Sequence, residues 1–259
     1  MSIKKIMAAT AVGGALAVSA FSAQAISLKV LFTDLDANVS QLVSGVDDLD
    51  FTGTVGEWNI EFDVEANEFI GFGVSELVQS QLSAGTQRIG FGANAPFNPN
   101  PQGRLLVQVV GTGFGEGANA PFPSALGFTV QGNGLGGSLE GRGFVNDSND
   151  DLVEGPPVEF PSEEQIGDPL VFVEEDFSPI NPSWFGGTSE NGVLEDPFSI
   201  SLSFLIVHDG DGFSVNDDRT TLTATASAVA LPVPVPAALP LFATALLGLG
   251  LLGRRRMRG

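Results

Sequence analysis

The side chains in this sequence that could do chemistry are mostly carboxylates, and nine of the 31 lie in three short clusters. These clusters occupy positions 34–38, 147–151 and 209–218. In the second cluster, Asp147, Asn149 and Asp151 place oxygen ligands at alternate positions, as calcium-binding loops do. However, Leu152 and Val158 stand where an EF-hand needs Gly and a bidentate Glu. Calcium is therefore the one cofactor that the sequence indicates, and a solvated acidic loop is the competing interpretation.

The single histidine and a glycine motif are the remaining candidates for chemistry. His208 opens an Asp-rich loop, where it could act as a general base or metal ligand, or bond to a neighbouring carboxylate. Gly132–Gly137 satisfies G-x-G-x-x-G, but more glycines follow where a nucleotide site needs a helix. The chain contains no Cys and no G-x-S-x-G elbow. We therefore predict no catalytic residues and a protein that is not an enzyme.

Charge is distributed unevenly along the 259 residues. Of 11 basic side chains, six lie in the two end segments, whereas all 31 acidic side chains lie between residues 26 and 231. That central stretch therefore has five basic against 31 acidic side chains, a formal charge of −26. Such a surface repels phosphate backbones, which excludes nucleic acid as a partner, and it attracts divalent cations.

The first 25 residues have the organisation of an export signal. Lys4 and Lys5 precede an uncharged, Ala-rich run over 6–21, and Ala23 and Ala25 form a small-residue cleavage site. We predict that signal peptidase cleaves after Ala25. The alternative is a segment that stays in place as a membrane anchor.

The other end of the chain has three parts in a fixed order. A proline-rich stretch over 231–237 leads into 17 uncharged, largely apolar residues over 237–253. As a helix these residues span about 25 Å, close to the lower limit for crossing a membrane. An arginine cluster follows, and arginines favour the cytoplasmic side, which places the acidic body outside. The cluster consists of Arg254, Arg255 and Arg256.

This tail resembles the PEP-CTERM family of sorting signals, and in particular its VPLPA variety. The matching residues are Val233, Pro234, Val235, Pro236 and Ala237. Val235 replaces the usual Leu, and no Glu lies between the prolines as in the PEP form. The resemblance implies recognition by an exosortase, removal of the tail and transfer to the cell surface or extracellular matrix of a Gram-negative bacterium. A permanent single-pass membrane anchor is the alternative.

The central region is dominated by apolar residues that alternate with polar ones. This period of two predicts strands over 26–32, 58–64, 198–206 and 222–228, the last two as antiparallel neighbours joined by the acidic loop 208–219. Shorter candidates are 69–74, 104–111, 126–131 and 170–173, and residues 75–82 suit two helical turns or a strand. We predict an all-β fold, a β-sandwich or jelly-roll-like body, with a helix in each terminal signal.

The predicted organisation is a signal peptide over 1–25, an acidic β-rich extracytoplasmic domain over 26–231 and a sorting tail over 232–259. Residues 146–169 are expected to form an exposed insertion or a seam. The sequence Ala-Asn-Ala-Pro-Phe occurs at 93–97 and again at 118–122, which predicts two equivalent loops, with a ligand-binding pair as the alternative.

These observations predict an exported cell-surface or matrix protein that is processed by signal peptidase and an exosortase. While its tail is present, the membrane holds it through the C-terminal helix. Its body is expected to be structural or to bind cations, exopolysaccharide or other matrix components. The alternatives are a secreted carbohydrate-active enzyme or lectin, and a permanently membrane-anchored surface domain.

Overall fold

The structure is a computed structural model, and every regular element that it describes is a β-strand. It describes residues 25–71, 77–91, 102–115, 122–133, 137–151, 164–173, 183–195, 197–209 and 219–231. The strands are β1 (Ser27–Asp34), β2 (Val39–Val46), β3 (Asp48–Val55), β4 (Trp58–Gly71), β5 (Leu77–Phe91), β6 (Gln102–Phe114), β7 (Phe122–Asn133), β8 (Ser138–Asn146), β9 (Glu164–Gln165), β10 (Leu170–Val173), β11 (Ser183–Leu194), β12 (Phe198–Asp209) and β13 (Arg219–Ala230).

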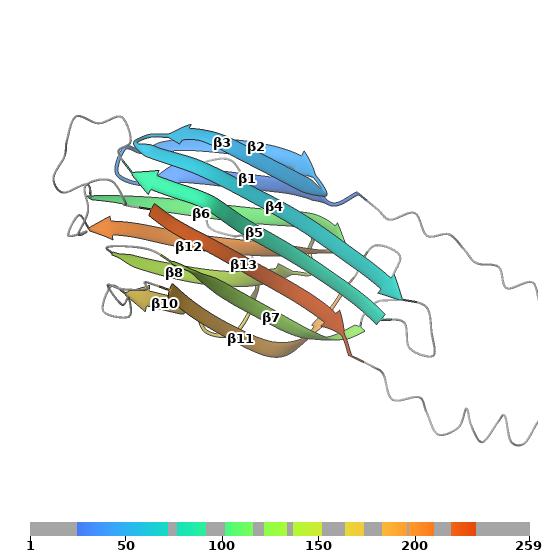
Figure 1. Ribbon diagram of the computed structural model, residues 1–259. Helices are drawn as coiled ribbons and strands as arrows, with labels where there is room; N and C mark the ends of the chain where they lie inside the picture. The colour runs from blue at the N-terminus through green and yellow to red at the C-terminus, as the bar shows by residue number, and fades with distance from the viewer. Residues whose placement is uncertain are drawn as a thin grey trace, which may run out of the picture.

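The strands pair in the order β10-β8-β12-β6-β1-β2-β3-β4-β5-β13-β7-β11, and β9 adds to β8. Every pairing is antiparallel. A corner at Asp47 joins β2 to β3 through a single residue pair, and there the sheet folds over. Strands β10 to β2 then stack against strands β3 to β11, as Figure 1 shows. The described residues are thus all-β, as predicted for the body.

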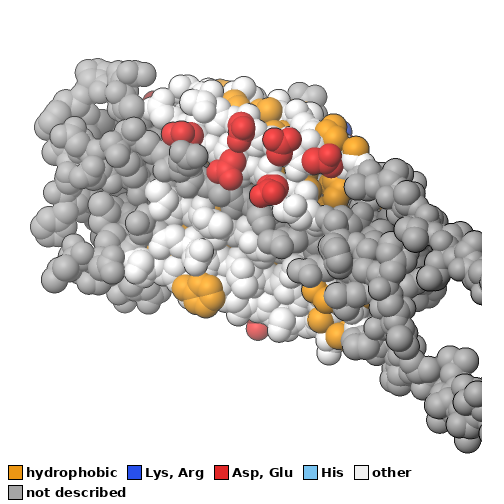
Figure 2. Space-filling model, turned by 45° about the vertical axis from the view of Figure 1, so that its right-hand side comes forward, with side chains coloured by type: hydrophobic (Ala, Val, Ile, Leu, Met, Phe, Trp, Pro, Cys, Tyr) orange, Lys and Arg blue, Asp and Glu red, His pale blue; other side chains and the backbone are white. Residues whose placement is uncertain are grey.

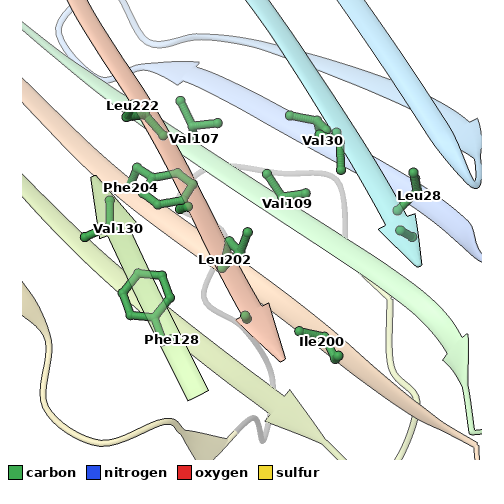
Figure 3. Packing of buried hydrophobic residues seen from close by; sticks show 14 of the residues in the cluster. Leu28, Val30, Val107, Val109, Phe128, Val130, Ile200, Leu202, Phe204 and Leu222 are labelled. Atoms are coloured by element: carbon green, nitrogen blue, oxygen red, sulfur yellow. The ribbon is translucent and has the colours of Figure 1, made fainter. Parts of the chain in front are cut away.

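The core lies between the two stacked layers, where the apolar residues of the alternating strands point. Figure 3 shows Leu28 and Val30 of β1, Val107 and Val109 of β6, and Leu202 of β12 among these side chains. All five are fully buried. The period-two alternation therefore predicted the inward faces of β1, β4, β12 and β13 correctly. Such alternation arises because one side of a strand is buried and the other is not.

The predicted pairing of the last two long strands is wrong. Strand β12 pairs with β6 and β8, whereas β13 pairs with β5 and β7. The two strands contact each other from opposite layers. Alternation shows which side of a strand is buried but not which strand lies beside it, and the connection is long enough to cross between layers.

Glycine-rich stretches form strands where the facing layer places large rings. In β8, a Cβ at Gly143 would lie 2.9 Å from Phe128 Cβ, and one at Gly141 would lie 3.2 Å from Phe128 Cζ. The glycines therefore provide a flat strip for the Phe128 ring, which is fully buried. Residues 77–82 belong to strand β5, so the strand alternative holds for this part of 75–82.

Several predicted features lie outside the described residues. They are the signal up to residue 24 with Ala23, the tail from 232 with both terminal helices, most of the two repeats, residues 72–76 and 152–163, and the acidic loop after Asp209. Within the described ranges, no helix has the length and apolar character needed to cross a membrane.

Candidate functional site

The three residues of the predicted calcium loop turn to three different partners. Asn149 Oδ1 accepts a hydrogen bond of 2.7 Å from Gly113 N, and Asp147 Oδ1 accepts one of 3.4 Å from Glu195 N. Asp151 forms an ion pair with Lys29. In the described part of the chain, no group of three or more His, Asp or Glu side chains is arranged to hold a metal ion. The loop connects β8 to β1 and β6, and calcium binding here stays a prediction.

The first carboxylate cluster joins two turns of the fold. The Asp34 side chain is 2 % exposed, and its Oδ1 accepts hydrogen bonds from the backbone N–H groups of Asp36 and Ala37 at 3.0 and 2.9 Å. Its Oδ2 accepts a third from Glu57 N at 3.1 Å. Backbone donors thus stabilise the buried carboxylate, which joins the β1–β2 turn to the β3–β4 turn.

Asp36, from the same cluster, is exposed and binds one of the few basic residues. Its Oδ1 accepts hydrogen bonds from Arg104 Nε at 3.0 Å and from Arg104 Nη2 at 2.7 Å. Its Oδ2 accepts a further one from Arg104 N at 2.8 Å. These side-chain hydrogen bonds from Arg104 lower the pKa of Asp36, since they favour the charged carboxylate. Asp36 therefore has a structural role: it connects the β1–β2 turn to β6.

His208 lies within strand β12 and not in a turn as expected. The side chain is 3 % exposed, and its ring centroid lies 5.0 Å from that of Trp58. Burial lowers the pKa of His208 to about 4, because desolvation penalises the charged imidazolium. The imidazole is therefore neutral at neutral pH and is part of the packing between β12 and β4.

A cluster of acids that the sequence did not reveal covers the outer face of β3 and β4. This acidic strip consists of Asp48, Asp50, Glu61, Asp63 and Glu65. Asp48 lies directly opposite Glu65, and Asp50 directly opposite Asp63. Figure 2 shows acidic side chains gathered on the upper part of one face of the molecule. Like charges that face each other across two strands destabilise a sheet, so the strip is not explained by stability.

Electrostatics within the acidic strip follow from this pairing. Partial burial, and after it the charges of Asp50 and Glu65, raise the pKa of Asp63 above its usual range. Cations that approach the strip would relieve this repulsion. The signal for the strip was present in the sequence, because its acids occupy the polar positions between buried Leu49, Phe51, Phe62 and Val64.

A second surface feature lies on the same layer, over β13, β7 and β11. This polar hollow has a volume of about 550 Å³ and is lined by Gln131, Gly132, Ser183, Trp184, Phe185, Thr221, Leu222 and Thr223. The register sets Thr223, Gln131 and Phe185 side by side in one row across the three strands. Because their side chains alternate with those that enter the core, this row faces outward.

The lining of the polar hollow is uncharged and includes an exposed aromatic ring. Phe185 is 70 % exposed, whereas the neighbouring Trp184 is 6 % exposed and stacks on Phe172 with ring centroids 4.9 Å apart. Trp184 Nε1 is buried and has no hydrogen-bond acceptor within the described residues. Hydroxyl and amide groups beside an aromatic ring are the usual chemistry of sites for neutral, hydroxyl-rich ligands.

The glycine motif at Gly132–Gly137 begins in the last two residues of β7 and ends just before β8. A strand that begins at Ser138 follows it, so the helix that a nucleotide site would require is not there. Gly132 itself allows close packing, because a Cβ there would lie 2.9 Å from Trp184 Cη2.

Comparisons with known proteins add little to this geometry. No protein-family model and no curated protein matches the chain. A solved structure from the Gx strain of infectious bursal disease virus aligns with 88 % of this chain and 73 % of its own, at 9 % identity and a TM-score of 0.14. A score this low carries no argument about the fold or the function.

Proposed function

We propose that this chain is an exported surface or matrix protein that an exosortase sorts through its C-terminal tail. The observation that carries the proposal is the order of three parts at the end of the sequence: the Val233–Ala237 motif, an apolar segment and Arg254–Arg256. An N-terminal segment with Lys4, Lys5 and a small-residue site at Ala25 supports export by the same route. The body is then a β-sandwich with an acidic surface that works outside the cell.

The ends of the described body agree with this topology. Strand β1 begins and β13 ends at the same end of the body, on the right in Figure 1. A leader before Ala25 and a tail after Leu231 would therefore leave from one end, which suits attachment of both to a single membrane. The acidic strip lies on the outer face of the body, where cations of the medium can reach it.

The sorting motif is tested by replacing Pro234 and Pro236 with Ala in the full chain. We expect the variant to stay in the membrane fraction, because an extended, accessible site should no longer be presented. Pro232→Ala, one residue before the motif, is the matched control and should be released normally. Unchanged release of the double variant would refute sorting through this motif. The mass of the surface protein would report both cleavages and any attached group.

A second candidate function is the binding of a neutral matrix polysaccharide in the polar hollow. The specific observation is the outward row of Thr223, Gln131 and Phe185 beside Ser183 and Thr221. Hydroxyl and amide groups can bond to sugar hydroxyls while an exposed ring packs on the apolar face of a sugar. The described lining residues include no carboxylate, and glycoside hydrolysis commonly uses two, so this hollow favours a lectin over a glycosidase.

Calorimetric titration of the full chain with cellohexaose, maltohexaose and dextran tests this binding. We expect one of these probes to bind and Phe185→Ala to weaken it about tenfold, the size of effect that loss of an aromatic anchor produces. Val193→Ala is the matched control, since Val193 is also exposed on β11 and lies away from the hollow. No heat with any probe, or equal effects of the two variants, would exclude the site.

A further inference from the structure

Asp47 is a junction between three strands at the corner where the sheet folds over. Its backbone N–H donates to Ile26 O at 2.9 Å, and its carbonyl accepts from Ala66 N at 2.8 Å. Its carboxylate Oδ1 accepts a hydrogen bond of 2.8 Å from Ile26 N. The residue holds a φ of 62°, which few side chains other than Asn and Asp tolerate. The corner between the layers thus depends on contacts between Asp47 and the start of β1.

Ile26 is the first residue after the predicted signal cleavage. Its side chain is 2 % exposed and belongs to the core, whereas Ala25 before it is exposed. Signal peptidase would add water across the Ala25–Ile26 peptide bond. The carboxylate would leave with Ala25, and the nitrogen of Ile26 would become an α-ammonium group. The atom that gains the charge is the atom that already donates to Asp47 Oδ1.

We propose that removal of the leader creates an ion pair between the Ile26 α-ammonium and the Asp47 carboxylate, and that this pair fastens the corner of the mature fold. The inference rests on the proposed function through the cleavage site. Before cleavage a neutral amide donates to the ionised carboxylate; after cleavage both partners are charged, so an ion-pair attraction is added to the hydrogen bond. Cleavage by signal peptidase therefore adds a stabilising contact to the fold as well as removing the leader.

The charges around the corner support this assignment. Asp47 forms no ion pair with a side chain of the described residues, so the ammonium would be its first cationic partner there. The nearest acids along the strands are Asp48 and Glu65, which face each other in the acidic strip. Lys29, the basic residue of β1, already pairs with Asp151. An added positive charge at Ile26 would therefore lie in a strongly acidic region.

The test compares melting temperatures of chains that run from Ile26 to Gly259, prepared in detergent with a removable fusion partner. We expect Asp47→Asn to lower the Tm by about 5 °C near pH 6.5, as loss of a charge-assisted hydrogen bond in a domain of this size should. Asp48→Asn is the matched control, because it removes the same charge one residue away. A wild-type chain that retains Ala25 as its first residue should melt lower than the Ile26 chain.

A pH series separates the ion pair from a purely structural role for Asp47. The Asp47→Asn deficit should shrink above about pH 8, where an α-amino group loses its proton. Equal melting of the Ile26 and Ala25 chains, or equal effects of Asp47→Asn and Asp48→Asn, would overturn the proposal. These chains do not depend on cellular cleavage, so a native protein that starts at Met1 would refute export processing and leave this result standing on its own.

Discussion

Two ends of one layer share a core and differ in the charge that they present to the solvent. Strands β3 and β4 bury Leu49, Phe51 and Phe62 and present the acidic strip outward. Strands β7, β11 and β13 bury Phe128 and Leu222 and present the uncharged polar hollow. Figure 2 shows the contrast as acids on the upper part of the face and very few below.

This difference indicates that the inward and outward positions of these strands are constrained independently. Inward positions must fill the space between the layers, and hydrophobic residues of suitable size do so at either end. Outward positions can vary with little effect on folding, so a costly pattern there points to use. Facing acids reduce stability, and the strip accumulates them on one hairpin although the chain has many other exposed positions.

Acidification should have the largest effect on stability, and it acts in opposite directions on the two sides of β4. Burial holds the pKa of His208 at about 4 in the fold, against an ordinary 6.5. Between these values the unfolded chain binds a proton that the folded chain does not, so stability falls as the pH drops from 6.5 to 4. The loss amounts to about 3 kcal/mol. On the outer side, protonation of Asp63 relieves repulsion.

Urea unfolding at several pH values measures this effect, with His208→Gln as the comparison. The substituted side chain of this variant is neutral at every pH, so the stability of the variant should fall less between pH 6.5 and 4 than that of the wild type. Equal pH dependence in the two proteins would show that His208 is not the group responsible.

A smaller effect is expected at Gly132 in the polar hollow, where close packing depends on the absence of a side chain. Gly132→Ala would place a Cβ 2.0 Å from the Thr221 carbonyl oxygen and 2.9 Å from Trp184 Cη2. Backbone cannot easily move aside, so we expect a loss of about 2 kcal/mol in the free energy of unfolding. Gly127→Ala in the same strand is the control, since its nearest neighbour is Ser227 Oγ at 3.3 Å. Similar denaturation midpoints for both variants would contradict this packing argument.

Sequence analysis missed both the acidic strip and the polar hollow, but only the strip left a local signal. The strip belongs to one hairpin, and the alternation around Trp58–Val64 that predicts the buried face of β4 also leaves Glu61 and Asp63 on the opposite face. The hollow needs the register of β7, β11 and β13, which are distant in the sequence. Strand β11 also contains Gly186, Gly187 and Gly192, whose lack of side chains hides the alternation. The corner at Asp47 could not be predicted either, because its contacts come from Ile26, just before β1, and from Ala66 of β4.

The smallest effects are expected when either of two exposed aspartates, Asp50 or Asp36, is replaced with Asn. Asp50→Asn removes a charge that faces Asp63, so stability should rise by about 0.5 kcal/mol at low salt. Asp36→Asn removes the partner of Arg104, so stability should fall by less than about 1 kcal/mol.

Salt and a titration separate the causes of these two effects. Both should diminish at high ionic strength, because exposed charges are screened there. Asp50→Asn should also move the pKa of Asp63 down toward its ordinary value, since the charge of Asp50 is one of the causes that raise it. NMR titration of the carboxyl groups measures this shift directly. If Asp50→Asn destabilises the protein, or leaves the pKa of Asp63 unchanged, the facing carboxylates do not repel each other. Repulsion within the acidic strip would then not contribute to the raised pKa of Asp63.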